Sequence, residues 1–309
     1  SEVSAGGGPD MFLAPNDSLG DQVRKNLLLP LDDKLAGKLT NISPTAVEGM
    51  KVDGKLYAVP ESFKAVALYY NTEKVTAPPA TTDDLLTAVK GGQTLVINQG
   101  IYHNFGFIQS FGGKLFDANN KCAAATGGPE ALQYLLDLKG AGATFVTDGG
   151  QQDTLFKEGT AFMTVNGPWA LGDYRKALGD KLGVAPMPAG PGGKSGPLTG
   201  VDGFYVNVNS ANPDGAVALA LFLTSTDSQT LYTEKAGHVP ADITVKIADK
   251  NVQGFADASS TGVPRPQSKE LSNFWAPFGD ALTKSMEGAA SPKDAIAEAC
   301  GLMDTANGK

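Results

Sequence analysis

Three short apolar runs, each followed by a polar turn and a segment suited to a helix, constrain the fold most strongly. The runs occupy residues 11–14, 94–97 and 161–165. Short runs that alternate with helices are typical of strands in an α/β architecture. The sequence therefore predicts an α/β fold. In open α/β sheets, ligands bind beyond the carboxyl ends of the strands.

Two helices are predicted from their start signals and their apolar spacing. The first covers residues 129–138, which open with a proline, and Gly140 follows shortly after its end. The second follows Ser291, a typical N-cap, with Pro292 in its first turn. The apolar stripe of this second helix includes Cys300, so we expect this cysteine to face inward.

The length of 309 residues corresponds to about two domains of roughly 150 residues each. Extended or loose stretches lie at residues 55–70, 200–208 and 249–266, and the last of them is rich in Asp, Ser, Gly and Pro. Three such stretches would let the chain pass repeatedly between two lobes. Each lobe is therefore expected to be discontinuous in sequence.

The net charge and the absence of known catalytic and phosphate-binding motifs make several classes of function unfavourable. Twenty-five Lys and Arg residues against 33 Asp and Glu residues give a net charge of −8, which disfavours binding to nucleic acid or to anionic membrane surfaces. The sequence contains no G-x-S-x-G, G-x-x-x-x-G-K-S/T or H-E-x-x-H motif, and its only histidines are His103 and His238. We expect no metal site and no cofactor. A carboxylate pair that cleaves glycosides stays open as a distant alternative.

The two cysteines, Cys122 and Cys300, allow two interpretations. Neither belongs to a C-x-x-C or Cys/His cluster, so a structural zinc site is not indicated. Cys300 could be a small buried hydrophobic residue with a free thiol, which is common for cysteine. Alternatively, it could form a disulfide with Cys122, which lies in a loop before the first predicted helix. The sequence leaves both interpretations open.

The turns after the three apolar runs carry a mixture of amides, carboxylates and aromatic rings. Sugar hydroxyls hydrogen-bond to Asp, Asn and His, and sugar C–H faces stack on Trp and Tyr. The ligand candidates at these turns are Asn16, Asp17, Tyr102, His103 and Trp169. The alternative for Asn16 and Asp17 is a helix cap, and the alternative for Trp169 and Trp275 is filling of the core.

Five segments together resemble one known family, the extracytoplasmic solute-binding proteins of ABC sugar importers, in particular the maltose- and maltodextrin-binding group. The similarity extends over essentially the whole chain, and the segment that ends in Asn166-Gly167-Pro168-Trp169 is the most discriminating. The segments that carry the resemblance are residues 7–12, 52–63, 67–71, 156–169 and 274–275.

The resemblance implies a two-lobed, type II periplasmic-binding-protein-like fold with the ligand held between the lobes. The N-terminal lobe is expected to comprise residues 1–62 and 204–250, and the C-terminal lobe residues 66–198 and 256–309. The implied hinges lie near residues 62–66, 198–204 and 250–256.

The resemblance also implies roles for individual residues. Tyr102, Trp169 and Trp275 match aromatic positions that stack on sugar rings, and Asp17 matches a carboxylate that bonds hydroxyls. Asp202, at the second crossing, is expected to reach the ligand, and Lys64 is included in the binding set. Relatives from enteric bacteria carry an acidic residue at Lys64, an aromatic one at Ala14 and an arginine at Ser18, so the sugar and its length stay open.

The family opens with a strand, a helix and a strand that have no counterpart ahead of residues 7–12. A carboxylate and a lysine that bind sugar in the family lie in that opening. We expect the full-length protein to be a monomer, and this chain to associate with the missing N-terminal segment or with a second chain that fills its place.

The implied function is delivery of maltose or maltooligosaccharides to the ABC permease subunits from an extracytoplasmic location, periplasmic or as a cell-surface lipoprotein. The implied protein is not an enzyme. The alternatives are the same fold with another sugar, a polyol or a sugar phosphate as ligand, for which Lys64 or Arg265 could supply the positive charge. The distant alternative is a carboxylate-dependent carbohydrate-active enzyme.

Overall fold

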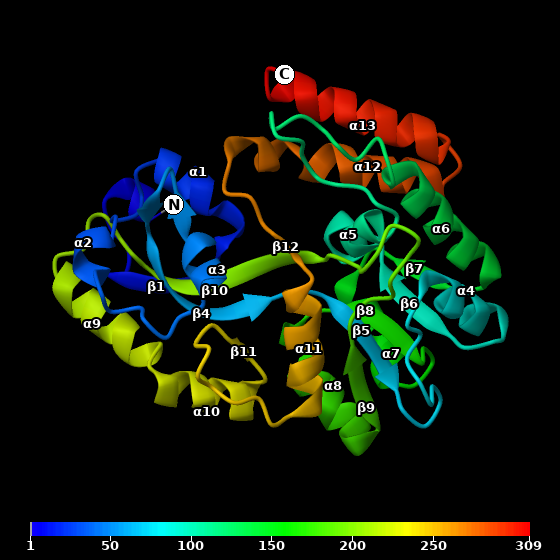
Figure 1. The fold of residues 1–309 in the computed structure, drawn as a ribbon, viewed down its shortest axis with the longest axis horizontal. Helices are drawn as coiled ribbons and strands as arrows, with labels where there is room; N and C mark the ends of the chain where they lie inside the picture. Colours follow the sequence, from blue (N-terminus) through cyan, green and yellow to red (C-terminus); the bar gives the residue numbers. More distant parts are fainter. Residues whose placement is uncertain (1) are drawn as a thin grey trace. The chain divides into compact units, whose positions relative to one another are not determined.

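The computed structural model describes residues 2–309, and the chain folds into two compact units of mixed helix and sheet. This confirms the predicted α/β class. Unit 1 comprises residues 2–64, 199–253 and 264–269, and unit 2 comprises residues 65–198, 254–263 and 270–309. Figure 1 shows the course of the chain through both units.

Unit 1 is built on an antiparallel sheet whose central strands come from distant parts of the sequence. The strand order is β1 (Met11–Pro15), β10 (Leu198–Val206), β4 (Ala58–Lys64) and β11 (Val239–Pro240), and β12 (Val263–Pro264) also pairs with β10. The strand predicted at residues 11–14 is therefore confirmed. A separate hairpin joins β2 (Lys51–Val52) to β3 (Lys55–Leu56) through Asp53 and Gly54, whose φ angles are both positive, as a tight hairpin turn requires.

Short helices pack on the unit 1 sheet and complete its core. The core includes the fully buried side chains of Leu31, Met50, Val59 and Tyr205. The helices are η1 (Val3–Ala5), η2 (Asn16–Ser18), α1 (Leu19–Arg24), α2 (Asp32–Leu35), α3 (Pro44–Glu48), α9 (Pro213–Leu223) and α10 (Thr226–Ala236).

Unit 2 contains a mixed five-stranded sheet. Its strands lie in the order β7 (Thr144–Val146), β6 (Leu95–Asn98), β8 (Met163–Asn166), β5 (Ala67–Asn71) and β9 (Leu182–Ala185). β6 runs parallel to β7 and β8, whereas β5 is antiparallel to β8 and β9. The apolar runs at residues 94–97 and 161–165 are confirmed as the strands β6 and β8.

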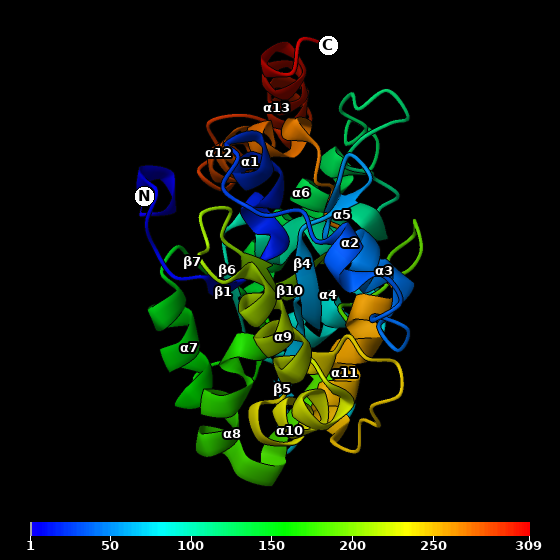
Figure 2. The same cartoon turned by 90° about the vertical axis from the view of Figure 1, so that its left-hand side faces the viewer.

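Both helices predicted from start signals occur in unit 2, as α6 (Gly128–Ala141) and α13 (Pro292–Ala306). Helix α12 (Trp275–Met286) lies beside α13, and α7 (Gly149–Lys157) packs against α8 (Leu171–Leu178) (Figures 1 and 2). In α13 the side chain of Ser291 accepts a hydrogen bond from the backbone of Asp294, and Cys300 lies on the buried face, as expected. The helices are α4 (Thr82–Lys90), α5 (Ile101–Ser110), α6 (Gly128–Ala141), α7 (Gly149–Lys157), η3 (Pro168–Ala170), α8 (Leu171–Leu178), η4 (Gly179–Lys181), η5 (Lys269–Asn273), α12 (Trp275–Met286) and α13 (Pro292–Ala306).

The prediction of a loose stretch at residues 249–266 is largely wrong, because α11 (Lys250–Ser260) occupies most of this segment. Asp249 accepts hydrogen bonds from the first backbone amides of this helix. Val252, Phe255 and Ala258 are buried and recur every three residues, so one apolar face holds the helix in place. The high content of Asp, Ser and Gly in this segment hid that spacing.

The chain passes from one unit to the other after residues 64, 198, 253, 263 and 269. Residues 199–203 belong to unit 1, and the change between units near residue 253 falls within α11 rather than in a loop. Residues 264–269 return to unit 1, where Arg265 donates a backbone hydrogen bond to Thr199. The role of the three crossings as hinges stays a prediction.

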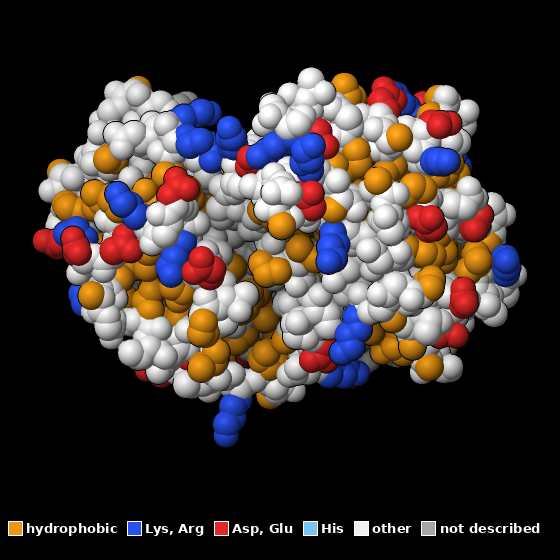
Figure 3. All heavy atoms as spheres, turned by 45° about the horizontal axis from the view of Figure 1, so that its top comes forward, with side chains coloured by type: hydrophobic (Ala, Val, Ile, Leu, Met, Phe, Trp, Pro, Cys, Tyr) orange, Lys and Arg blue, Asp and Glu red, His pale blue; other side chains and the backbone are white. Residues whose placement is uncertain are grey.

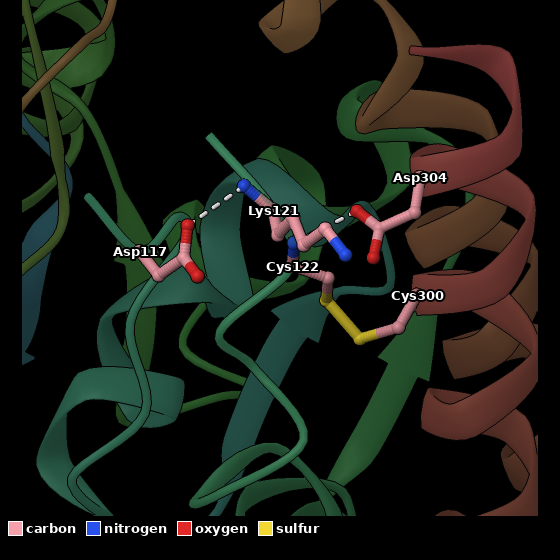
Figure 4. The surroundings of a disulfide bond; sticks show 5 residues. All are labelled: Asp117, Lys121, Cys122, Cys300 and Asp304. Carbon is pink, nitrogen blue, oxygen red and sulfur yellow. Dashed lines mark hydrogen bonds between the residues drawn. A yellow bond between two sulfur atoms is a disulfide. The ribbon is translucent and has the colours of Figure 1, made fainter. Parts of the chain in front are cut away.

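Cys122 and Cys300 form a disulfide within unit 2 (Figure 4). Their Cα atoms lie 5.3 Å apart, although 178 positions separate them in sequence. The backbone amide of Cys122 also donates a hydrogen bond to the Asp304 carboxylate on α13, with a length of 2.8 Å. Of the two interpretations left open by the sequence, the structure adopts the disulfide, which ties the loop before α6 to the last helix.

Candidate functional site

Three aromatic side chains of unit 2 lie together where β6 and β8 end. Tyr102 and His103 are in the first turn of α5, and Trp169 is in η3 directly after β8. The ring centre of Trp169 lies 6.2 Å from that of Tyr102 and 6.4 Å from that of His103. Trp169 is 51% exposed, which rules out the core-filling interpretation for this residue. Together the three rings form an aromatic surface in which Trp169 is exposed and Tyr102 and His103 are partly buried.

The turn before Trp169 determines where its indole lies. Gly167 has no side chain, and the indole occupies the space beside its Cα. The backbone carbonyl of Gly167 accepts a hydrogen bond from the buried Tyr69 hydroxyl, and its backbone amide donates one to the Asn166 side chain. These two contacts fix the turn, so the indole position follows from it.

His103 contacts a buried network of polar side chains. The Asp153 carboxylate accepts hydrogen bonds from the Tyr174 hydroxyl and from the Asn166 side chain, and Asn166 in turn hydrogen-bonds to His103. Burial lowers the pKa of His103 to about 4, and the contacts with Asn166 and Asp153 oppose this only in part. His103 is therefore neutral near pH 7, with one ring nitrogen that donates and one that accepts hydrogen bonds.

Trp275, the fourth aromatic candidate, begins α12 in unit 2. Its ring centre lies 5.2 Å from that of Phe274, and its partly buried side chain packs against the core of the unit. Core packing thus accounts for part of the Trp275 surface, in line with the alternative raised from sequence. A role for the remaining exposed part stays a prediction.

Asn16 was expected to be either a ligand residue or a helix cap, and its contacts fit neither role. It is 1% exposed, its side-chain nitrogen donates to the carbonyl of Gly49, and its side-chain oxygen accepts from the amide of Val201. Helix α1 takes Ser18 as its N-cap residue, so Asn16 is not its cap. The partners of Asn16 lie far away in sequence, and the structure assigns it to holding unit 1 together rather than to an accessible ligand site.

Asp17 is more exposed than its neighbour and forms an ion pair with Arg265. The Asp17 side chain is 55% exposed, whereas that of Arg265 is 4% exposed. Burial lowers the pKa of Arg265 to about 10, which still leaves the guanidinium charged at neutral pH. Asp17 therefore compensates a buried cation and keeps an accessible face on which a hydroxyl could bind.

Lys64 and Asp202 form an ion pair between the last residue of β4 and the middle of β10, both in unit 1. The Asp202 side chain is 5% exposed and that of Lys64 is 29% exposed. Burial raises the pKa of Asp202, while Lys64 acts in the opposite direction. The structure thus brings together two residues that the sequence placed in the binding set for separate reasons.

Two further polar residues of unit 1 were not among the candidates. Glu61 is 2% exposed and accepts a hydrogen bond from Ser62, and its other oxygen lies 2.8 Å from Nδ1 of His238. The hydrogen bond to Glu61 raises the pKa of His238, although burial opposes it. No local sequence pattern pairs Glu61 with His238, because the two residues are 177 positions apart.

Comparison with known sequences decides the family. The profile described as bacterial extracellular solute-binding protein matches residues 1–254, most of the chain. The chain belongs to this family. The resemblance stated from the sequence is therefore confirmed, and the two units are those of a solute-binding protein.

Individual relatives of this solute-binding protein are similar over nearly its whole length. It is 28% identical to the maltotriose-binding protein of Pyrococcus abyssi, over 96% of this chain and 69% of the relative. It is 26% identical to the galactooligosaccharide-binding protein of Bacillus subtilis, over 99% of this chain and 78% of the relative. The structure of Thermus thermophilus maltotriose-binding protein with maltotriose matches with a TM-score of 0.87 and 30% identity, covering 99% of this chain and 87% of the other.

The surface and the helices add two observations about this solute-binding protein. On the face drawn in Figure 3, basic and acidic side chains lie interspersed rather than gathered by sign. Among residues 2–309, no helix combines the length and the apolar character needed to cross a membrane.

Proposed function

We propose that this protein is the sugar-binding component of an ABC importer and that its ligand is a maltooligosaccharide. The observation that carries the proposal is the exposed Trp169 ring beside the partly buried rings of Tyr102 and His103. Large aromatic side chains are normally buried, so an exposed indole beside a tyrosine and a neutral imidazole favours a ligand with apolar faces and many hydroxyls. An α-glucan has both.

Unit 1 offers charged groups to sugar hydroxyls, at Asp17 and at the Lys64–Asp202 pair. Stacking on Trp169 supplies apolar contact area, and the charged groups give specificity, because hydrogen bonds to charged groups are stronger than neutral ones.

The proposed partner is the pair of permease subunits of an ABC importer, and the proposed location is extracytoplasmic. The family description supports the location, and a relative from Streptococcus pneumoniae named maltooligosaccharide ABC transporter solute-binding lipoprotein supports the partner. We also propose that the protein binds its ligand without chemical change, because its family and its relatives are described as binding proteins.

Isothermal titration calorimetry tests the ligand directly. We expect heat with maltotriose and maltotetraose, weaker binding of maltose, and none with unrelated sugars. Binding of galactooligosaccharides instead would favour the second candidate, which rests on the Bacillus subtilis relative. Chromatography of the recovered sugar is expected to show it intact, and shortened products would indicate an enzyme.

A further inference from the structure

Unit 1 buries two carboxylates side by side at the end of β4. Glu61 and Asp202 are 2% and 4% exposed, and burial, together with the charge of Glu61, raises the pKa of Asp202. Buried carboxylates need compensating charge. Two basic groups face them: Lys64 on β4, and His238 just before β11, which is cationic only when protonated.

A bulge between β4 and β10 creates this arrangement. Asp202 pairs with Ser62 and Gly203 pairs with Pro60, so Glu61 has no opposite residue on β10. Gly203 permits the close approach, since a methyl group there would come within 2.6 Å of the Met50 side chain. Bulges re-aim side chains in this way and are frequent beside binding sites.

One oxygen of this cluster is left for a ligand. Glu61 uses one carboxylate oxygen on His238 and the other on the Ser62 hydroxyl. Asp202 uses Oδ2 on Lys64, while its Oδ1 is buried and has no hydrogen-bond partner among residues 2–309. A hydroxyl donor from a ligand would satisfy this oxygen.

The charge of the cluster depends on His238. With His238 neutral, Glu61 and Asp202 share the single positive charge of Lys64, and the cluster carries one net negative charge. With His238 protonated, each carboxylate has its own cation and the net charge is zero. Two phenols also border the cluster: Tyr205, whose pKa is raised by burial, and Tyr232, whose ring centre lies 5.7 Å from that of His238.

We propose that Glu61 and His238 are positioning residues for the Lys64–Asp202 pair, and that protonation of His238 strengthens the hold of this pair on a sugar hydroxyl. When His238 is neutral, Glu61 attracts the Lys64 ammonium away from Asp202, and the pair loses its alignment. This inference rests on the proposed function, since it concerns the same sugar site.

The test is the affinity for maltotriose, measured by calorimetry from pH 5.5 to pH 8.5. We expect the wild-type affinity to fall by roughly fivefold across this range, at the lower end of typical coupling between sites. Glu61→Gln removes one negative charge and is expected to hold the high, acidic affinity at every pH. His238→Gln leaves the negative charge uncompensated and is expected to hold the low, alkaline affinity at every pH.

The matched control is Lys34→Gln, which removes a positive charge from an exposed ion pair with Asp214 in the same unit and should keep the wild-type pH profile. A wild-type affinity that is independent of pH, or variants that keep the wild-type profile, would overturn the positioning role alone. If the wild type binds no sugar at any pH, the proposed function fails, and the positioning role fails with it. Circular dichroism verifies that each variant folds. His238→Gln is the more conservative of the two substitutions, because His238 is partly exposed whereas Glu61 is buried.

Discussion

The indole of Trp169 lies so close to Gly167 that a methyl group on Gly167 would come within 2.1 Å of two indole carbons. Backbone φ at Gly167 is −98°, which any residue can adopt. The requirement for glycine at this position is therefore the space occupied by the indole, not the backbone conformation.

Gly167→Ala is expected to displace the Trp169 ring and to weaken maltotriose binding by about tenfold or more, because the ring contact depends on its orientation. Calorimetry measures the loss, and the tryptophan emission spectrum should shift with it. Gly172→Ala is the matched control, since a methyl group there meets no neighbour. Unchanged affinity in Gly167→Ala would argue against the aromatic surface as the sugar site.

Trp169→Ala is expected to reduce affinity by at least about tenfold while leaving thermal stability nearly unchanged, because the half-exposed ring buries little area in the ligand-free protein. Calorimetry and a thermal melt give the two values. Phe222→Ala, at a side chain that is 68% exposed in unit 1, serves as the control for loss of an exposed ring. Equal losses of affinity and stability in Trp169→Ala would restore the core-filling interpretation.

The contact between Glu61 and His238 gives stability a defined pH dependence. The pKa of His238 is raised above 6.5 in the folded protein, so this stabilisation is complete below about pH 6.5 and is lost as the pH rises through the raised value. We expect the difference in unfolding free energy between wild type and Glu61→Gln to shrink from pH 6 to pH 9. Urea titrations measure it, and a constant difference would contradict the role of His238.

Asn16→Ala removes two buried hydrogen bonds at once and leaves the Gly49 carbonyl and the Val201 amide without their partner. We expect a loss of about 2 kcal/mol or more in unfolding free energy, since each unsatisfied buried group is costly. Chemical denaturation measures this loss. The exposed Asn119→Ala should be neutral, and a neutral result for Asn16→Ala would return this residue to the list of ligand candidates.

Reduction of the Cys122–Cys300 disulfide is expected to lower the unfolding free energy by about 2–5 kcal/mol, because the bond closes a long loop in the unfolded chain. Denaturation with and without reductant measures the change. The double variant Cys122→Ser/Cys300→Ser should match the reduced wild type and should not respond to reductant. Alkylation of both thiols without reductant would contradict the bond.

The parts of the fold that sequence alone predicted are those with local signals. The strands β6 and β8 and the helices α6 and α13 each carry their apolar pattern and their start residues within a few positions. Helix α11 was missed because its polar and small residues resemble a loop, and because the apolar side chains that it buries are few: Val252, Phe255 and Ala258.

The residues of the candidate site also divide into those with a local sequence signal and those whose contacts are distant in sequence. Tyr102 and Trp169 could be named because they follow predicted strands directly. The burial of Asn16 depends on Val201, 185 positions away, and the contact of Glu61 with His238 spans 177 positions. The bulge that brings Glu61 beside Asp202 is one extra residue in β4, and no local sequence pattern marks its position.

The disulfide also sets the covalent topology of the chain. The bond between Cys122 and Cys300 closes a ring that contains residues 199–253 and 264–269, the two later segments of unit 1. A protease that cuts once anywhere between the two cysteines therefore yields pieces that migrate as a single species until a reductant is added. A cut before Cys122 instead releases a separate N-terminal fragment, so a non-reducing gel can locate the first site of cleavage.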